Sequence, residues 1–163
     1  MTEQGQSGGY RSPYRDDAHI DGASELLRAV HPQDVHPGED GTSLGLKSGA
    51  FQAMTAARAQ DLGYKVPAMS VGLMSTLMLY ADNSSDAIDL FLVRAGLGEF
   101  GVARLLASDV RSVVPPLGIM EDPLENQPWH ALVFPLTSSK ITGGAQKQMR
   151  AAAALIHPPT SLA

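Results

Sequence analysis

Polar residues that can act as acids, bases or anion ligands are scattered along the chain. A histidine titrates near neutral pH, and an arginine can hold a phosphate with two parallel hydrogen bonds. The catalytic candidates are Arg28, His31 and His130. The ligand-binding candidates are Arg28, Ser48, Ser70 and Asp122. Their spacing matches no standard catalytic arrangement, so the sequence leaves open whether the protein is an enzyme.

The stretch "EDPLENQPWHALVF", residues 121–134, raises the sharpest question. It places an acid, two prolines, the only tryptophan and His130 directly before an apolar run. In one interpretation His130 fastens the loop 121–128 to a strand through a ring nitrogen, with Asp122 or a backbone carbonyl as partner. In the other it is a general acid–base or a phosphate contact at the rim of an apolar surface. We favour the first, because the prolines and Trp129 explain the loop without a substrate.

A second cluster, "HPQDVHPGED", combines imidazoles with carboxylates. It contains His31, Asp34, His36, Glu39 and Asp40. Nitrogen and oxygen donors of this kind can bind zinc, which prefers a tetrahedral arrangement. The two histidines are five positions apart, each precedes a proline, and neither lies on an evident helix face. We therefore expect a polar turn, with no metal, and we predict no cofactor.

The stretch "GLGEFG", residues 96–101, matches the glycine pattern of dinucleotide-binding loops. That pattern binds pyrophosphate only when a strand precedes it and a helix follows it. Here a helix is predicted before it and a strand after it. The stretch is therefore expected to end a helix and form a turn.

The predicted elements alternate irregularly between helix and strand. Helices are expected over 48–63, with Ser48 as N-cap and Gly63 as its end, and over 85–95, with Ser84 or Ser85 as cap. Further helices are expected over 108–114 and 145–157, and strands over 100–107 and 130–134. Residues 21–32 begin with a short helix or an extended turn, 31–45 form a loop, and 67–80 are either strand or helix.

This pattern predicts an α+β fold, with a small mixed sheet packed by three to four helices. A length of 163 residues fits one domain. Residues 1–20 are polar and glycine-rich, which predicts a disordered tail. We expect a single globular domain over 21–157 and a flexible C-terminus over 158–163.

Charge and hydropathy limit the class of partner. The net charge is −5 and no run of Lys or Arg occurs, which argues against nucleic acid. The apolar window 66–80 is interrupted and shorter than the ~20 residues that span a bilayer. No secretory signal is seen at the N-terminus, and cysteine is absent. We expect a soluble cytoplasmic protein without membrane contact, and its oligomeric state stays open.

Four ordered motifs resemble a family of small bacterial proteins of uncharacterised function. They are "LLRAVHP", "KSGAF", "MSV" and "EDPLENQPWHA", similar to the family's R-x-[IV]-H-P, S-x-x-A-F, [LM]-S-V and D-P-x-x-x-x-P-x-H-A. The resemblance covers residues 26–134 and the closing helix. The stretch between Phe51 and Met69 is longer than in the family pattern. The resemblance implies no established activity.

Two functions from different classes follow. The first is an accessory or interaction protein of a bacterial multi-gene system, which binds a protein partner. The alternative is a small enzyme or binding protein for a nucleotide-like ligand that uses Arg28, His31, Ser48 and His130. This set resembles the layout of ADP-ribosyltransferase-like folds, where the arginine holds a phosphate and the serine orders the ribose. No glutamate stands on the strand "HALVF" to supply the late catalytic acid of such folds.

Overall fold

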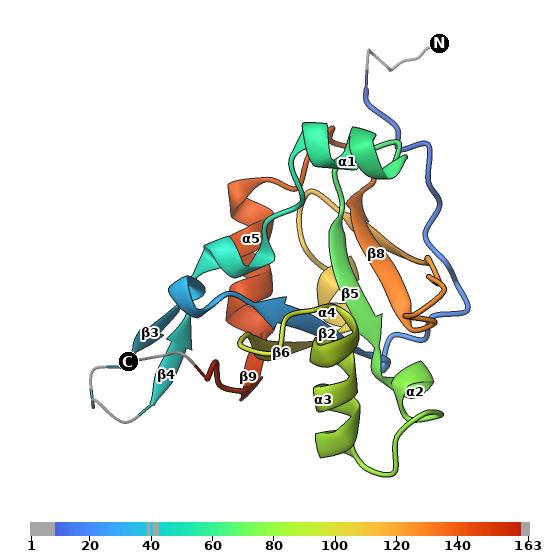
Figure 1. The fold of residues 1–163 in the computed structure, drawn as a ribbon. Helices are drawn as coiled ribbons and strands as arrows, with labels where there is room; N and C mark the ends of the chain where they lie inside the picture. The colour runs from blue at the N-terminus through green and yellow to red at the C-terminus, as the bar shows by residue number, and fades with distance from the viewer. Residues whose placement is uncertain (1–8, 39, 41–42, 161–163) are drawn as a thin grey trace.

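Six antiparallel strands form the main sheet of the computed structural model, which describes residues 9–38, 40 and 43–160 (Figure 1). Their order across the sheet is β7-β8-β5-β2-β6-β9. The strands are β2 (Glu25–Val30), β5 (Met69–Leu73), β6 (Gly101–Leu106), β7 (Leu117–Glu121), β8 (His130–Pro135) and β9 (Ala154–His157). A separate hairpin, β3 (Val35–Pro37) and β4 (Leu44–Leu46), lies beside β9.

Five α-helices and two 3-10 turns complete the described part of the chain. They are α1 (Ala56–Leu62), α2 (Met74–Leu77), α3 (Ser84–Arg94), α4 (Ala107–Arg111), α5 (Gly143–Ala152), η1 (Pro32–Asp34) and η2 (Ser48–Phe51). The α+β class and the single domain are thus confirmed. The main sheet is larger than expected and antiparallel throughout instead of mixed, and the described residues form five α-helices instead of three to four. Within residues 9–38, 40 and 43–160, no helix is long and apolar enough to cross a membrane.

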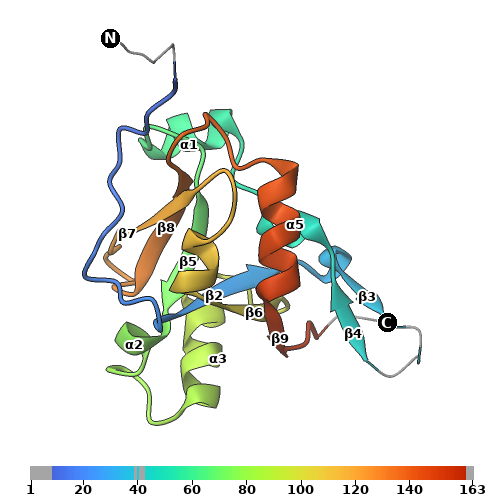
Figure 2. The same cartoon turned by 180° about the vertical axis from the view of Figure 1, so that it is seen from behind.

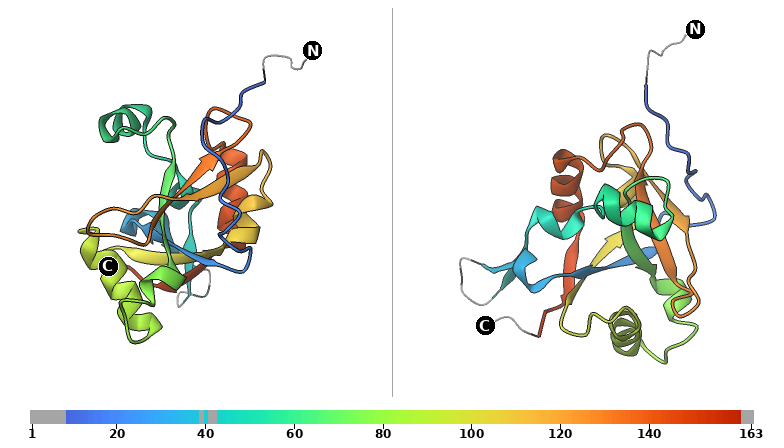
Figure 3. Two further views of the ribbon diagram at one scale, coloured as in Figure 1. Left: turned by 90° about the vertical axis from the view of Figure 1, so that its right-hand side faces the viewer. Right: turned by 45° about the horizontal axis from the view of Figure 1, so that its top comes forward.

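Apolar side chains pack on both faces of the main sheet. On one face the core includes Val110 of α4 and Met149 of α5, both with no exposed surface; Figure 2 shows these helices on that side. On the other face, Leu77 of α2 and Phe91 of α3 pack with Trp129. Helices α2 and α3 lie at the same end of the molecule, and α1 lies away from them (Figure 3).

Residues 25–30 form an inner strand, so the short helix considered there is wrong. Strand β2 pairs with β5 on one side and with β6 on the other. Leu26 and Leu27 are both fully buried, although they point to opposite faces. A strand buried on both faces lacks the alternation of apolar and polar residues that identifies a strand from sequence.

The long helix predicted over 48–63 is divided into η2 and α1. Lys47, not Ser48, occupies the N-cap position of η2, and Thr55 caps α1 by accepting a hydrogen bond from the Arg58 amide at 3.1 Å. Gly63 ends α1 in the left-handed conformation, with φ of 81°, as predicted. The side chain of Thr55 accepts the hydrogen bond of the Arg58 amide. In a continuous helix that amide would donate to the main-chain carbonyl four residues earlier, so this contact favours a new helix start at Thr55.

The helix from 85 to 95, the strands over 100–107 and 130–134, and the helix near 108–114 are confirmed. Helix α3 begins one residue earlier than expected, and the predicted cap is wrong: Asn83, not Ser84 or Ser85, caps the helix by accepting a hydrogen bond from the Asp86 amide at 2.8 Å. Gly96 follows the helix with φ of 72°, and strand β6 comes next. The stretch 96–101 therefore joins a helix to a strand, in the order opposite to that of a dinucleotide loop.

In three other segments the observed secondary structure differs from the prediction or decides between its alternatives. The ambiguous stretch 67–80 contains both a strand, β5, and a short helix, α2. The closing helix ends at Ala152, and the residues after it form β9, because Leu155 and His157 pair with β6. Residues 31–45, expected to be a loop, contain η1 and the β3–β4 hairpin, and β7 was not predicted.

Residues 9–20 pack against the sheet, so the expected tail is not borne out for them. This segment runs beside β7 (Figure 2), and the Asp17 amide donates to the Ile119 carbonyl at 2.7 Å. Ile20 is 5% exposed. Arg111 holds the segment by donating to the Ile20 carbonyl at 2.6 Å and to Asp16 at 3.1 Å. Residues 1–8 of the predicted tail lie outside the described residues.

The C-terminal segment also makes contacts where flexibility was expected. Pro159 is buried, and the Thr160 amide donates to the Glu99 carbonyl at 3.1 Å. A Cβ atom at Gly101 would lie 2.8 Å from the His157 carbonyl oxygen, so glycine allows this close approach. Residues 161–163 are outside the described part of the chain.

Candidate functional site

Arg28 joins three separate segments through main-chain carbonyl groups. Its Nε donates to the Ala50 carbonyl at 2.9 Å, its Nη1 to the Ser70 carbonyl at 3.0 Å and its Nη2 to the Gln52 carbonyl at 3.1 Å. The side chain extends from β2 and reaches both β5 and the η2 segment. We call this group of contacts the Arg28 joint.

The charge of Arg28 is retained at neutral pH inside this joint. Burial lowers the pKa of Arg28 to about 10, and the negative charge of Asp34 acts in the opposite direction. Three of the five N–H donors of the guanidinium already have main-chain acceptors. The side chain therefore holds the fold together, and at most two donors remain for a ligand.

A hollow of about 250 Å³ opens beside the Arg28 joint. It is lined by Arg28, Asp34, Gly49, Gln52, Ala53, Met54, Ala68 and Ser70. Two of the predicted ligand-binding residues, Arg28 and Ser70, thus line one hollow. A Cβ atom at Gly49 would lie 2.9 Å from Asp34 Oδ1, so the glycine lets this carboxylate approach the η2 turn. Ser48, His31, Asp122 and His130 do not line it.

His31 and Ser48 have local positions in the fold. His31 caps η1, with its Nδ1 accepting from the Gln33 amide at 3.0 Å. Its ring meets Phe100 edge-on, with 5.1 Å between the centroids. Ser48 is the first residue of η2. Each of the two residues thus starts a 3-10 turn next to the Arg28 joint.

His130 belongs to a different polar network, formed with Asp122 and Tyr64. The His130 Nδ1 lies 3.0 Å from the Asp122 carbonyl oxygen and 3.1 Å from Asp122 Oδ2. Because both partners are acceptors, Nδ1 carries the proton and donates it. Tyr64 donates its hydroxyl to the same Oδ2 at 2.6 Å. The expected contact between His130 and Asp122 is therefore present.

The electrostatics of this network fix the protonation of the tyrosine. Burial raises the pKa of Tyr64, and the hydrogen bond to Asp122 and the charge of Asp122 raise it further. The phenol thus stays protonated and can donate. An imidazole held by a carboxylate is an arrangement that enzymes use to orient a base. His130, however, is only 7% exposed, and the network ties the loop before β8 to the residues that follow α1.

The exposed apolar side chains gather at the end of the molecule formed by α2 and α3. Seven large apolar residues of the described chain are exposed, and five belong to this end. They are Met78, Leu79, Tyr80, Val93 and Leu124. We call this set the α2–α3 surface. Leu79 is the most exposed at 79%, and the other two exposed residues, Leu62 and Val114, lie elsewhere in the chain.

Trp129 forms a rigid base under this surface. Its ring is fully buried and meets Tyr80 edge-on at 5.8 Å, while the Arg94 guanidinium lies 5.9 Å from its centroid. Arg94 donates to the Asn126 carbonyl at 3.1 Å, and the Asn126 side chain donates to the Arg94 carbonyl at 3.3 Å. These contacts attach the loop containing Leu124 to the end of α3.

In the residues that the structure describes, no group of three His, Asp or Glu side chains could hold a metal ion. Glu39 of the cluster considered above lies outside those residues. His36 instead covers Gly45 across the β3–β4 hairpin, where a Cβ atom would lie 2.6 Å from the ring.

No family model, no curated protein and no solved structure matches this chain. The resemblance to a family of small bacterial proteins, and the looser one to ADP-ribosyltransferase-like folds, therefore stay predictions. The candidate site is therefore described from the contacts and distances in the structure alone.

Two features of the site were not predicted. Tyr64 is 58 positions from Asp122, so no local spacing signals their contact. The α2–α3 surface did leave a signal: the apolar run 66–80 is longer than the strand it contains, and its last residues, "LMLY", come directly before a polar turn.

Proposed function

We propose that this protein is an accessory protein that binds a protein partner through the α2–α3 surface. The observation that carries the proposal is the concentration of five of the seven exposed large apolar side chains at this end. Apolar residues scattered singly over a surface need no explanation, whereas a group of them marks an interaction site. The Arg28 joint and the His130 network support the same function indirectly, because three donors of Arg28 and the Nδ1 of His130 already have partners within the fold.

The composition of this end also suits a protein interface. Tyrosine, tryptophan and arginine are enriched among the residues that dominate binding energy. Tyr80 and Arg94 both rest on the buried Trp129 ring, so little conformational freedom remains to be lost when a partner binds.

The charge beside the apolar residues suggests the chemistry of the partner. Asp86, Asp89 and Val93 recur at helical spacing and are exposed on one side of α3, and Asp82 precedes the helix. A partner with basic residues around an apolar centre would complement this surface. The net charge of −5 likewise favours a basic protein segment over nucleic acid.

We further propose that this binding takes place in the bacterial cytoplasm, in which a chain without cysteine needs no disulfide. Fractionation of cells that make the tagged protein tests this placement. Recovery from the periplasm would contradict it.

Site-specific photo-crosslinking tests the main proposal. A photoreactive amino acid is placed at Leu79 in one protein and at Val114 in another, because both positions are largely exposed, at 79% and 71%. We expect one defined crosslinked protein from position 79 and none from position 114. The same products from both positions, or a product only from position 114, would contradict the proposal.

A second candidate function is the binding of a small nucleotide-like ligand beside the Arg28 joint. The observation that favours it is that Arg28, Asp34 and Ser70 line one hollow. The two spare N–H donors of Arg28 and the Asp34 carboxylate would pair with a ligand that offers an acceptor and a donor, as a nucleobase edge does. His130 is not part of this hollow, so the ligand would use Arg28 and Ser70 without it.

A melting-temperature screen with nucleotides and dinucleotides tests this candidate. A ligand that raises the melting temperature of the natural protein, but not of Asp34→Asn, would support it. If no nucleotide raises the melting temperature at millimolar concentration, the candidate fails.

A further inference from the structure

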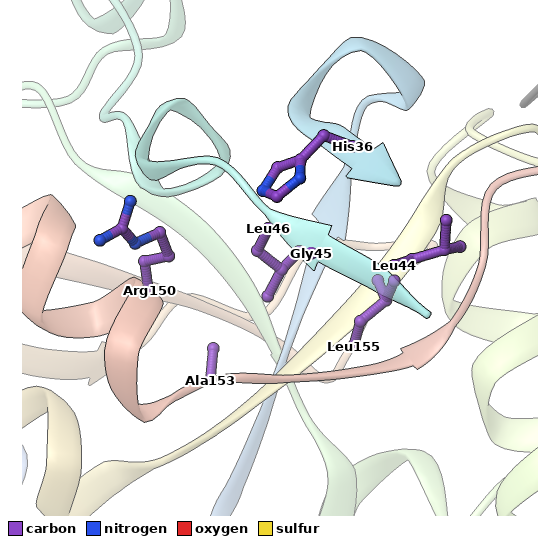
Figure 4. Close-up of a pocket in the computed structure, with 7 residues that line it drawn as sticks. All are labelled: His36, Leu44, Gly45, Leu46, Arg150, Ala153 and Leu155. Carbon is purple, nitrogen blue, oxygen red and sulfur yellow. The ribbon is translucent and has the colours of Figure 1, made fainter. Parts of the chain in front are cut away.

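A second hollow lies on the side of the molecule formed by the β3–β4 hairpin, the end of α5 and β9 (Figure 4). Its volume is about 400 Å³, within the ~300–1,000 Å³ common for small-molecule sites. It is lined by His36, Leu44, Gly45, Leu46, Arg150, Ala153 and Leu155. None of the sequence motifs discussed above predicts this combination.

The apolar part of the hollow is a continuation of the core. Leu44, Leu46, Ala153 and Leu155 are partly buried and pack against the main hydrophobic cluster. Each is therefore held in place on its inner side while its outer side lines the hollow. These four side chains supply the apolar share of the lining, whereas the larger share of its exposed surface is polar.

The guanidinium of Arg150 and the imidazole of His36 complete the lining. Figure 4 shows the His36 ring directed toward the side on which Arg150 lies. Among the described residues, the Arg150 guanidinium has neither a hydrogen bond nor an ion pair, and no Asp or Glu lines the hollow. The charged side chain that the described residues bring to this lining is therefore a guanidinium.

His36 is held in its position by the hairpin. It lies opposite Gly45 in the β3–β4 ladder, and its Nδ1 is 3.1 Å from the Pro37 carbonyl oxygen. A Cβ atom at Gly45 would lie 2.6 Å from the ring, so the glycine lets the ring lie in this position. Because Nδ1 donates to the carbonyl, Nε2 is the ring atom left for a ligand.

From these contacts we infer that this hollow binds a carboxylate carried on an aliphatic body. The guanidinium of Arg150 pairs with the carboxylate, since planar carboxylate and guanidinium groups form two parallel hydrogen bonds. The aliphatic body lies on Leu44, Leu46 and Leu155. Two sources offer this chemistry: a free aliphatic acid, and the C-terminal residue of a protein chain. The inference does not depend on the α2–α3 surface.

Amide chemical shifts of the full chain provide the test, with sodium octanoate as the first probe. We expect octanoate at millimolar concentration to shift the amides of residues 44–46 and 153–155. Octylammonium, which has the same chain and the opposite charge, should leave them unchanged. Arg150→Gln should weaken octanoate binding at least about tenfold, because it removes the charge-assisted pair. Lys147→Gln, a change on the same helix outside the hollow, should not.

A tetrapeptide of two alanines followed by two leucines separates the two sources. Tighter binding of its free acid than of octanoate, lost when the C-terminus is an amide, identifies a protein C-terminus as the ligand. Binding of octanoate alone identifies a free acid. The inference is overturned if neither probe shifts these amides, if octylammonium shifts them as much, or if Arg150→Gln binds as the natural protein does. Equal weakening by Lys147→Gln would also overturn it.

Discussion

The Arg28 joint and the α2–α3 surface use their residues in opposite ways. At the joint, a charged side chain turns inward and gives three of its donors to carbonyl groups of other segments. At the surface, apolar side chains turn outward, with Leu79 at 79% exposure. A polar residue in a suggestive motif can thus be occupied by the fold, while apolar residues without a motif are available to a partner. Substitutions at the joint should change stability, and those on the surface should change binding.

The largest effect is expected from removing residues 1–20. Ile20 and Tyr14 would lose their packing, and Arg111 would lose its acceptors in this segment. Burial of two large side chains and hydrogen bonds to a charged group contribute about 5 kcal/mol or more. Chemical denaturation of the full chain and of a chain that starts at Asp21 measures the difference. Equal free energies of unfolding would mean that the segment does not contribute to stability.

Helix α3 allows the two kinds of position to be compared within one element. Phe91 is 6% exposed, whereas Val93 is 67% exposed. Phe91→Ala should cost about 3–5 kcal/mol, as large-to-small changes in a core do. Val93→Ala should stay within about 0.5 kcal/mol. A cost below 1 kcal/mol for Phe91→Ala would show that the wrong face of α3 has been assigned to the core.

Arg28→Met should destabilise the protein by about 3 kcal/mol, because three carbonyl groups lose a charged donor. Arg104→Met is the matched control, since Arg104 is exposed on the neighbouring strand β6. The control should change the free energy of unfolding by less than about 0.5 kcal/mol. Thermal and urea unfolding of both variants provide the measurement. Similar effects of the two substitutions would mean that the joint is not important for stability.

Apart from the control substitutions, the smallest expected effect on stability is that of His130→Gln. Glutamine keeps one donor for Asp122 but cannot titrate, so we expect a cost of about 1–2 kcal/mol. His19→Gln, at an exposed position, serves as the control and should have no measurable effect. If His130→Gln left unfolding unchanged and abolished an activity of the protein, His130 would be a catalytic residue instead.

These contrasts also explain which parts of the fold could be predicted from sequence. Helix α3 could be, because a polar stretch that can cap a helix, Asp86 in the first turn and Gly96 after the last turn all agree locally, although the capping residue is Asn83 and not one of the two predicted serines. Strand β2 could not, because it is apolar on both faces and Leu26, Leu27 and Val30 also fit one side of a helix. Strand β9 follows a run of alanines, whose helix propensity is overridden by pairing with β6.

In the candidate site, too, only contacts between residues close in the sequence could be predicted. The partner of His130 is eight residues away in the same loop and strand, and it was expected from the sequence. The acceptors of Arg28 are main-chain oxygens 22 to 42 residues away, and main-chain groups have no sequence signature. The exposure of Leu79 depends on how α2 is placed after β5, which is a property of the tertiary fold.

The affinity for the crosslinked partner tests the central claim most directly. The partner is purified, and its binding to the natural protein, to Leu79→Asp and to Val114→Asp is measured by calorimetry. Both substitutions place a carboxylate at an exposed apolar position, so both proteins should fold. The account predicts that Leu79→Asp weakens binding at least about tenfold and that Val114→Asp leaves it unchanged. Equal affinity of the two variants would contradict it.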